Sequence, residues 1–192
     1  MTSLYIKVIR DEHRTISSIL AAILSMVKVG PKDDDARFFT TLRAMLFYLD
    51  EYPAKIHHPK ESEFLFAQLM SKSEKLSNII QELEADHYRE EAAIRELQYH
   101  LSAWEFLGET RRETFATKAK QYVDSYWRHM RAEETLIIPE AETLLSPEER
   151  DNLNARFAQN NDPICRAEQG HPLFERLYSR IVVQAPAPIG LG

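Results

Sequence analysis

The chain has 192 residues, of which 44% are hydrophobic, and carries a formal net charge of -6. This length is enough for one sizeable hydrophobic core but leaves little for a second domain of ordinary size. The negative charge argues against a general nucleic-acid binder or a binder of anionic membranes. No stretch approaches the ~20 apolar residues of a membrane span, and Met1 to Arg10 lack the pattern of a signal peptide. We therefore expect a soluble, cytoplasmic protein.

Two features of the composition indicate an all-α fold in a reducing compartment. Glycine occurs only 5 times, and apolar residues recur at spacings of three and four, with few alternating runs of the kind that form strands. The single cysteine, Cys165, excludes an intrachain disulfide bond. A lone cysteine is typical of proteins in reducing compartments.

The first two predicted helices cover residues 3–27 and 38–69. The stripe of the first helix repeats at three- and four-residue steps and also contains His13. Its apolar members are Ile6, Ile9, Ile16, Leu20, Ile23 and Val27. The second helix contains Pro53 and Pro59, and each proline removes one backbone donor, so we expect a kink there.

The third and fourth predicted helices also carry polar residues on their apolar stripes. Ser71 and Glu74 have the spacing of a capping box, which predicts the start of the third helix, and His87 lies on its stripe. The fourth helix begins near residues 109–113 and ends near Leu145. The residues that we expect it to bury are Phe115, Ala119, Tyr122, Tyr126, His129, Glu133 and Leu136.

The C-terminal part of the sequence predicts a helical extension to this bundle. Ser146 and Glu149 form a second capping box, with proline between them at the first helical position, so a fifth, shorter helix follows. A further helix is expected over residues 164–183, before a disordered tail. We therefore divide the chain into a bundle of residues 1–145 and an extension of residues 146–192, which could cover the bundle end, shield a site or contact a second copy.

Histidine and glutamate pairs supply the chemical signal. The spacing His-x-x-x-Glu places both side chains on one face of a helix, one turn apart. Four of the seven histidines have it, whereas about one such pair is expected by chance from the composition. The pairs are His57 with Glu61, His87 with Glu91, His129 with Glu133, and His171 with Glu175.

Buried polar side chains without partners would be costly, and metal binding removes that cost. Bundles of this type build metal sites from side chains that project inward from facing helices. Imidazole and carboxylate donors without cysteine suit iron, zinc or manganese, and two glutamates able to bridge favour a pair of metals. The donors alone leave iron, zinc and manganese open.

At these positions the sequence resembles the hemerythrin-like proteins, or HHE cation-binding domains, over residues 1–145. The matching residues are His13, the run from His57 to Phe66, His87, and His129 with Glu133. The resemblance implies an up-down four-helix bundle that holds a di-iron centre. It also implies that Glu61 and Glu133 bridge the irons, that His13 and His57 hold one, and that His87 and His129 hold the other.

The third helix departs from the oxygen-carrying members of that family. Those members have two histidines four residues apart on this helix, whereas Leu83 and Glu91 stand four residues before and after His87. The resemblance therefore argues against reversible oxygen carriage. It favours reaction with peroxide or nitric oxide, sensing, iron delivery, or a part in iron-sulfur-cluster repair.

Several polar residues near these positions allow two interpretations. We interpret His58 as an outer neighbour of the site or a solvent-facing residue, although it could trade places with His57. Glu91 is either a metal ligand or the partner of Arg95, and we favour the ion pair. Exposed positions are expected for Glu63, Glu90 and Glu134, core packing for Tyr122 and Tyr126, and positions outside the site for His100 and His171.

Three classes of function remain open from the sequence. The favoured one is a non-haem di-iron protein that binds or senses dioxygen, nitric oxide or peroxide, or that handles iron, with no assigned catalytic residue. The second is a di-iron enzyme that reduces peroxide or nitric oxide, and the third is a metal-free helical interaction protein. The expected partners are the small ligand and a redox partner, and a homodimer stays open.

Overall fold

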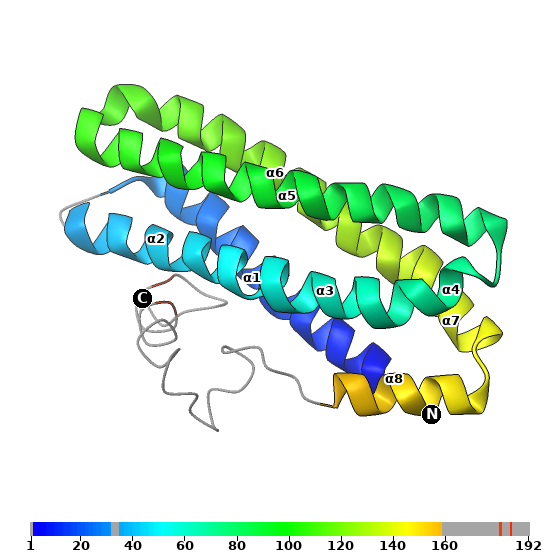
Figure 1. Ribbon diagram of the computed structural model, residues 1–192. Coiled ribbons are helices and arrows are strands. Elements are labelled where there is room, and N and C mark those ends of the chain that lie inside the picture. Colours follow the sequence, from blue (N-terminus) through cyan, green and yellow to red (C-terminus); the bar gives the residue numbers. More distant parts are fainter. Residues whose placement is uncertain (1, 32–34, 159–180, 182–184, 186–192) are drawn as a thin grey trace.

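The computed structural model describes residues 2–31, 35–158, 181 and 185, and within these residues the protein is a bundle of helices without strands. Four rods run side by side along the molecule (Figure 1). The first is α1 (Leu4–Val29), and the third is α5 (Glu74–Leu107). The second and fourth rods are each built from several shorter helical segments. The prediction of an all-α bundle followed by a C-terminal helix is confirmed.

The second rod is not one regular α-helix, because two wider π-helical segments interrupt it. It comprises α2 (Asp35–Glu51), η1 (Pro53–His57), α3 (His58–Lys60), η2 (Glu61–Phe66) and α4 (Ala67–Met70). Within it, the His57 amide donates to the carbonyl of Tyr52, five residues earlier, at 3.2 Å. Pro53 and Pro59 therefore lie in a stretch of altered helical register, and such π-helical turns are frequent at functional sites.

The fourth rod also contains a π-helical turn. It comprises the short η3 (Glu109–Arg111), α6 (Arg112–Ala132), η4 (Glu133–Ile137) and α7 (Ile138–Leu144). The predicted burial of Leu136 is wrong, since its side chain is 43% exposed and Ile137 is buried instead. The wider turn at η4 moves the apolar stripe by one residue.

The helix starts predicted from the sequence are confirmed in part. The fifth helix, α8 (Pro147–Phe157), packs against α1 and has the predicted capping box between Ser146 and Glu149. The capping box predicted for Ser71 is wrong, because α5 begins at Glu74 with Ser73 at its N-cap. The Ser71 hydroxyl instead donates to the Gln68 carbonyl at 3.3 Å. The rest of the predicted extension, with Cys165 and His171, lies outside the described residues apart from two buried positions, Ile181 and Ala185.

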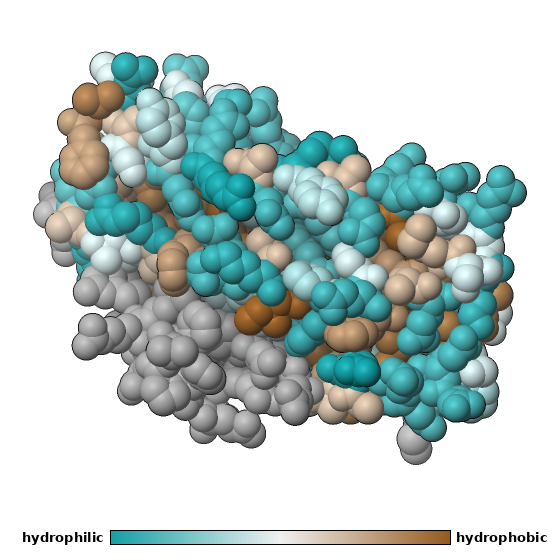
Figure 2. Space-filling model, in the orientation of Figure 1, coloured by the Kyte–Doolittle hydropathy of each residue, from teal (hydrophilic) through white to brown (hydrophobic). Residues whose placement is uncertain are grey.

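The hydrophobic core has two parts, and a group of buried polar residues lies between them. Along α1, the buried apolar residues between positions 5 and 9 belong to one cluster, and those between positions 16 and 27 belong to the other. Between these clusters lie Glu12 and His13, both buried. The outer surface of the bundle is mostly hydrophilic on the face seen in Figure 2. No helix among the described residues is long and apolar enough to cross a membrane.

Candidate metal centre

The six residues proposed as metal ligands lie together in the middle of the bundle. Each is at most 5% exposed. They come from all four rods: His13 from α1, His57 and Glu61 from η1 and η2, His87 from α5, and His129 and Glu133 from α6 and η4. The apolar clusters on both sides therefore separate this polar group from the two ends of the bundle.

Two carboxylates form the centre of the group, and imidazole nitrogens surround them. The Nε2 atom of His13 lies 3.3 Å from an oxygen of Glu133 and 3.7 Å from an oxygen of Glu61. His57 Nε2 is 3.4 Å from Glu61, and His129 Nε2 is 3.1 Å from Glu133. His87 Nε2 reaches Glu61 at 4.0 Å. Four Nε2 atoms thus converge on two carboxylates.

The opposite ring nitrogen of three of these histidines contacts an outer polar group. His57 Nδ1 donates to Glu12 at 2.7 Å, and His13 Nδ1 donates to Glu134 at 2.9 Å. His87 Nδ1 lies 3.4 Å from the Ser62 hydroxyl. Histidines that bind metals are commonly oriented in this way, since the outer partner fixes the ring and leaves the inner nitrogen free. Glu134, expected on an exposed face, thus contacts the site with a side chain that is 39% exposed.

Glu12 is a residue that the sequence interpretation missed. Its side chain is fully buried and also accepts a hydrogen bond from the Tyr52 hydroxyl at 2.6 Å. Burial alone would raise the pKa of Glu12, but the hydrogen bonds from His57 and Tyr52 lower it. The signal was present in the sequence, because Glu12 stands three residues after Ile9 and four before Ile16, on the apolar stripe.

Replacing Glu12 by glutamine should weaken metal binding about 10- to 100-fold, the usual cost of losing an outer partner of a ligand histidine. The neutral amide keeps the size of the side chain. It no longer offers the His57 ring an ionised acceptor for its hydrogen bond. A competition titration with a chelator measures the change. Asp11→Asn is the matched control, since Asp11 precedes Glu12 and pairs with Arg14 outside the site. Equal affinities for the two variants would refute a role for Glu12.

His58 lies within the cluster, so a solvent-facing position is wrong, whereas its role as an outer neighbour or as a ligand stays a prediction. It is 3% exposed, and its ring stacks on that of His87 with 4.0 Å between centroids. Its Nε2 atom lies 2.8 Å from the Tyr126 hydroxyl. Ligand atoms of His58, His87 and His129 fall within 4.8 Å of one another. Consecutive residues of an ideal α-helix point about 100° apart, but His57 and His58 meet at the end of a π-helical segment and both are buried.

If His58 binds metal, His58→Ala should change the metal content or the absorption spectrum of the metal-loaded protein. His100→Ala should change neither, because His100 lies outside the cluster and pairs with Glu96. Metal analysis and absorption spectroscopy on both variants give the comparison. A spectrum and metal content for His58→Ala identical to those of the unmodified protein would show that His58 only packs against the ligands.

The two neighbouring glutamates of α5 have opposite environments. Glu91 pairs with Arg95 at 3.3 Å, as the ion-pair interpretation expected. Glu90, expected on an exposed face, is only 3% exposed, and that expectation is wrong. It occupies the position between His87 and Ile94 on the stripe of α5, at steps of three and four residues.

The pKa values of the two central carboxylates are shifted in opposite directions. Burial and the nearby Glu133 raise the pKa of Glu61. Burial also acts to raise the pKa of Glu133, but His129 and His13 outweigh it and hold that pKa well below its usual range. Glu133 in turn raises the pKa of His129 to about 9 against the opposing effect of burial. A metal ion bound by His129 would therefore displace a proton from that ring.

The donors of the cluster are able to hold metal. Many inward-facing atoms have no hydrogen-bond partner among the described residues. Among these atoms are His13 Nε2, His58 Nδ1, Glu61 Oε2, His87 Nε2, both ring nitrogens of His129, and both carboxylate oxygens of Glu133. Ligand atoms also group in two places that share Glu61: with His13 and His57 on one side, and with His87, His129 and Glu133 on the other.

The protein is thus a helical bundle with a buried histidine and glutamate cluster that is able to hold metal. The family model described as the Hemerythrin HHE cation binding domain matches residues 4–141. The chain therefore belongs to the hemerythrin HHE cation-binding family, and the resemblance seen in the sequence is confirmed. Neither the comparison with curated proteins nor the comparison with solved structures found a match.

Proposed function

We propose that the cluster holds two iron ions and that the protein binds or senses dioxygen, nitric oxide or peroxide. The observation that carries this proposal is the position of Glu61, which belongs to two adjacent groups of ligand atoms. A carboxylate shared by two such groups is suited to bridge two metals. Nitrogen and oxygen donors without sulfur suit iron, although they also suit zinc or manganese.

In this proposal each residue has a defined task. Glu61 and Glu133 bridge, His13 and His57 hold one metal, and His87 and His129 hold the other. Glu12, Glu134 and Ser62 fix the rings of three histidines through their Nδ1 atoms. When bound, the iron pair supplies open coordination positions and electrons for a small ligand. The apolar clusters limit the access of water to the centre.

His58 raises the number of imidazoles near the centre, which bears on whether oxygen is bound reversibly. It places a second imidazole beside His87 from the neighbouring rod. In α5 itself, His87 is the histidine that reaches the cluster. The cluster therefore contains five histidines. However, the Tyr126 hydroxyl contacts His58 at 2.8 Å. With electrons from a bound iron pair, this hydroxyl would be placed to deliver one of the two protons that dioxygen needs to leave as hydrogen peroxide. The ligand count alone therefore does not decide reversibility.

We expect the reduced protein to react with dioxygen without acting as a reversible carrier, because the Tyr126 hydroxyl lies beside the cluster. Stopped-flow spectra after mixing with oxygenated buffer, followed by repeated deoxygenation under inert gas, test this. Recovery of the reduced spectrum over many cycles would contradict the expectation and assign the protein as an oxygen carrier. Tyr126→Phe should improve recovery if the hydroxyl is responsible.

The second candidate function is enzymatic reduction of peroxide or nitric oxide by the same centre. The buried Tyr126 hydroxyl and Glu90 carboxyl favour it, since both are polar groups beside His58 that could assist proton transfer. Sustained consumption of peroxide or nitric oxide with a supplied reductant would assign an enzyme. Uptake limited to one ligand per centre would assign a binding or sensing protein.

A further inference from the structure

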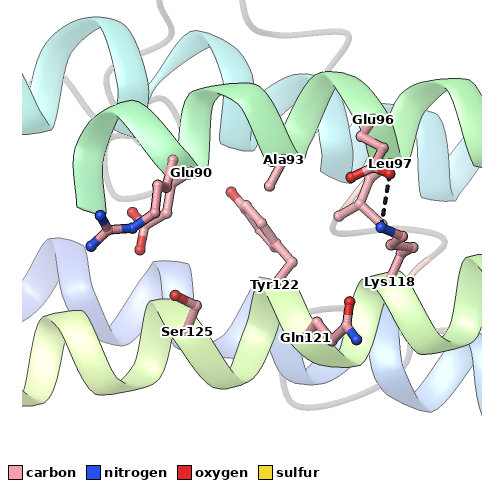
Figure 3. A pocket seen from close by; sticks show the side chains of 9 residues that line it. Glu90, Ala93, Glu96, Leu97, Lys118, Gln121, Tyr122 and Ser125 are labelled. Atoms are coloured by element: carbon pink, nitrogen blue, oxygen red, sulfur yellow. Dashed lines mark ion pairs between the residues drawn. The ribbon is translucent and has the colours of Figure 1, made fainter. Parts of the chain in front are cut away.

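A small pocket opens between α5 and α6 on the side of the bundle where Glu90 lies. Its volume is about 140 Å³. The inner wall includes Glu90, Ala93 and Tyr122, while Lys118 and Glu96 form an ion pair of 2.9 Å farther along the pocket. Figure 3 shows the side chains of Glu90, Tyr122 and Ser125 directed into the space between the two helices. The pocket thus extends inward from polar side chains at the surface.

Glu90 contacts both this pocket and the candidate metal centre. Its Oε2 atom lies 3.8 Å from His58 Nε2. Neither carboxylate oxygen has a hydrogen-bond partner among the described residues, although the side chain is 3% exposed. Burial raises the pKa of Glu90 to about 8. A buried carboxyl group without a hydrogen bond is costly, so its place between pocket and cluster requires an explanation.

The size of the pocket limits what can pass through it. A water molecule occupies about 30 Å³ in the liquid, whereas pockets for drug-sized ligands measure about 300–1,000 Å³. A volume of about 140 Å³ therefore corresponds to about four or five water-sized groups. Dioxygen, nitric oxide, peroxide and azide fit within it, whereas drug-sized organic molecules exceed it.

We propose that the pocket between α5 and α6 is the path by which such small molecules reach the metal centre. The Glu90 side chain closes the inner end of this path. This inference rests on the proposed function. It predicts that narrowing the pocket slows ligand binding and that shortening Glu90 accelerates it, while the metal stays bound.

A groove between α1 and α6 is the alternative path. His13, Ser17, Met130 and Glu134 contribute to its lining. There, however, His13 presents Nδ1, which is already bonded to Glu134, whereas its Nε2 atom faces the central carboxylates. A molecule in this groove therefore meets the outer edge of a histidine ring, which favours the path past Glu90.

The test is the rate of azide binding to the oxidised, iron-loaded full-length protein, followed by stopped-flow absorption. Ala93→Leu and Ser125→Leu each fill part of the pocket from a different helix, and each should slow binding at least tenfold. Ala92→Leu is the matched control, because it makes the same change at the next, exposed position. Glu90→Ala should accelerate binding at least tenfold, with Glu91→Ala as its control.

Iron content, measured separately for every variant, distinguishes failure of the proposed function from failure of the access path. An unmodified protein without iron would refute the proposed function. Full iron content with equal azide rates in all variants would overturn the access path alone. Slowing by Ser17→Leu, without slowing by Ala93→Leu or Ser125→Leu, would overturn it in favour of the groove beside His13.

Discussion

Glu61→Ala and Glu133→Ala should each abolish most of the metal binding of this protein. Both side chains are 1% exposed and contact ring nitrogens of the cluster. Losing either removes a central carboxylate rather than an outer partner, so the affinity should fall by more than the ~10- to 100-fold cost of outer-partner changes. Metal content after desalting, together with helical circular dichroism to verify folding, measures the effect.

The control for this experiment is Glu63→Ala, since Glu63 is exposed and only two residues from Glu61. It should retain the metal content of the unmodified protein. Glu134→Ala is not a neutral control, because Glu134 bonds to His13. Equal metal content in the Glu61, Glu133 and Glu63 variants would show that the central carboxylates are not ligands.

Removing the metal should lower the melting temperature by about 8–16 °C. A ligand at a thousandfold excess over its Kd stabilises the folded state by about 4 kcal/mol, and each 1 kcal/mol shifts the melting temperature of a protein of this size by about 2–4 °C. The cluster also leaves two neighbouring buried carboxylates, Glu61 and Glu133, without a bridging cation when the metal is absent. Calorimetry with and without a chelator gives the difference.

A matched control separates the loss of metal from a direct effect of the chelator. In Glu61→Ala, which should hold little metal, the chelator should leave the melting temperature unchanged. A melting temperature of the unmodified protein that is insensitive to chelator, despite verified removal of metal, would mean that the cluster does not couple metal binding to folding.

Much of the site could be predicted because its residues lie on apolar stripes. His13, His87 and His129 stand in register with buried aliphatic and aromatic residues, and regular helices carry that register over many turns. The bundle architecture follows from the same stripes, and the capping box of Ser146 and Glu149 correctly predicted the helix that follows Leu145. The structure brings all six proposed ligands together, while their binding of metal stays a prediction.

The missed residues have two physical causes. His58 and Leu136 were placed from the geometry of an ideal α-helix, whereas π-helical turns adjoin His58 and contain Leu136. Glu12 and Glu90 do lie on the predicted stripes, but a charged residue is seldom buried without a partner. The partners that account for the burial of Glu12 are His57 and Tyr52, which come from another rod. Glu90 lies beside His58 without a hydrogen-bond partner among the described residues.

The metal content of the protein, purified without a histidine tag, tests the central claim most directly. Elemental analysis combined with X-ray absorption spectroscopy gives both the identity and the number of bound ions. We predict close to two ions per chain, mainly iron, with nitrogen and oxygen ligands. A single tetrahedral zinc ion per chain, or no metal after growth with added iron, would contradict the di-iron account.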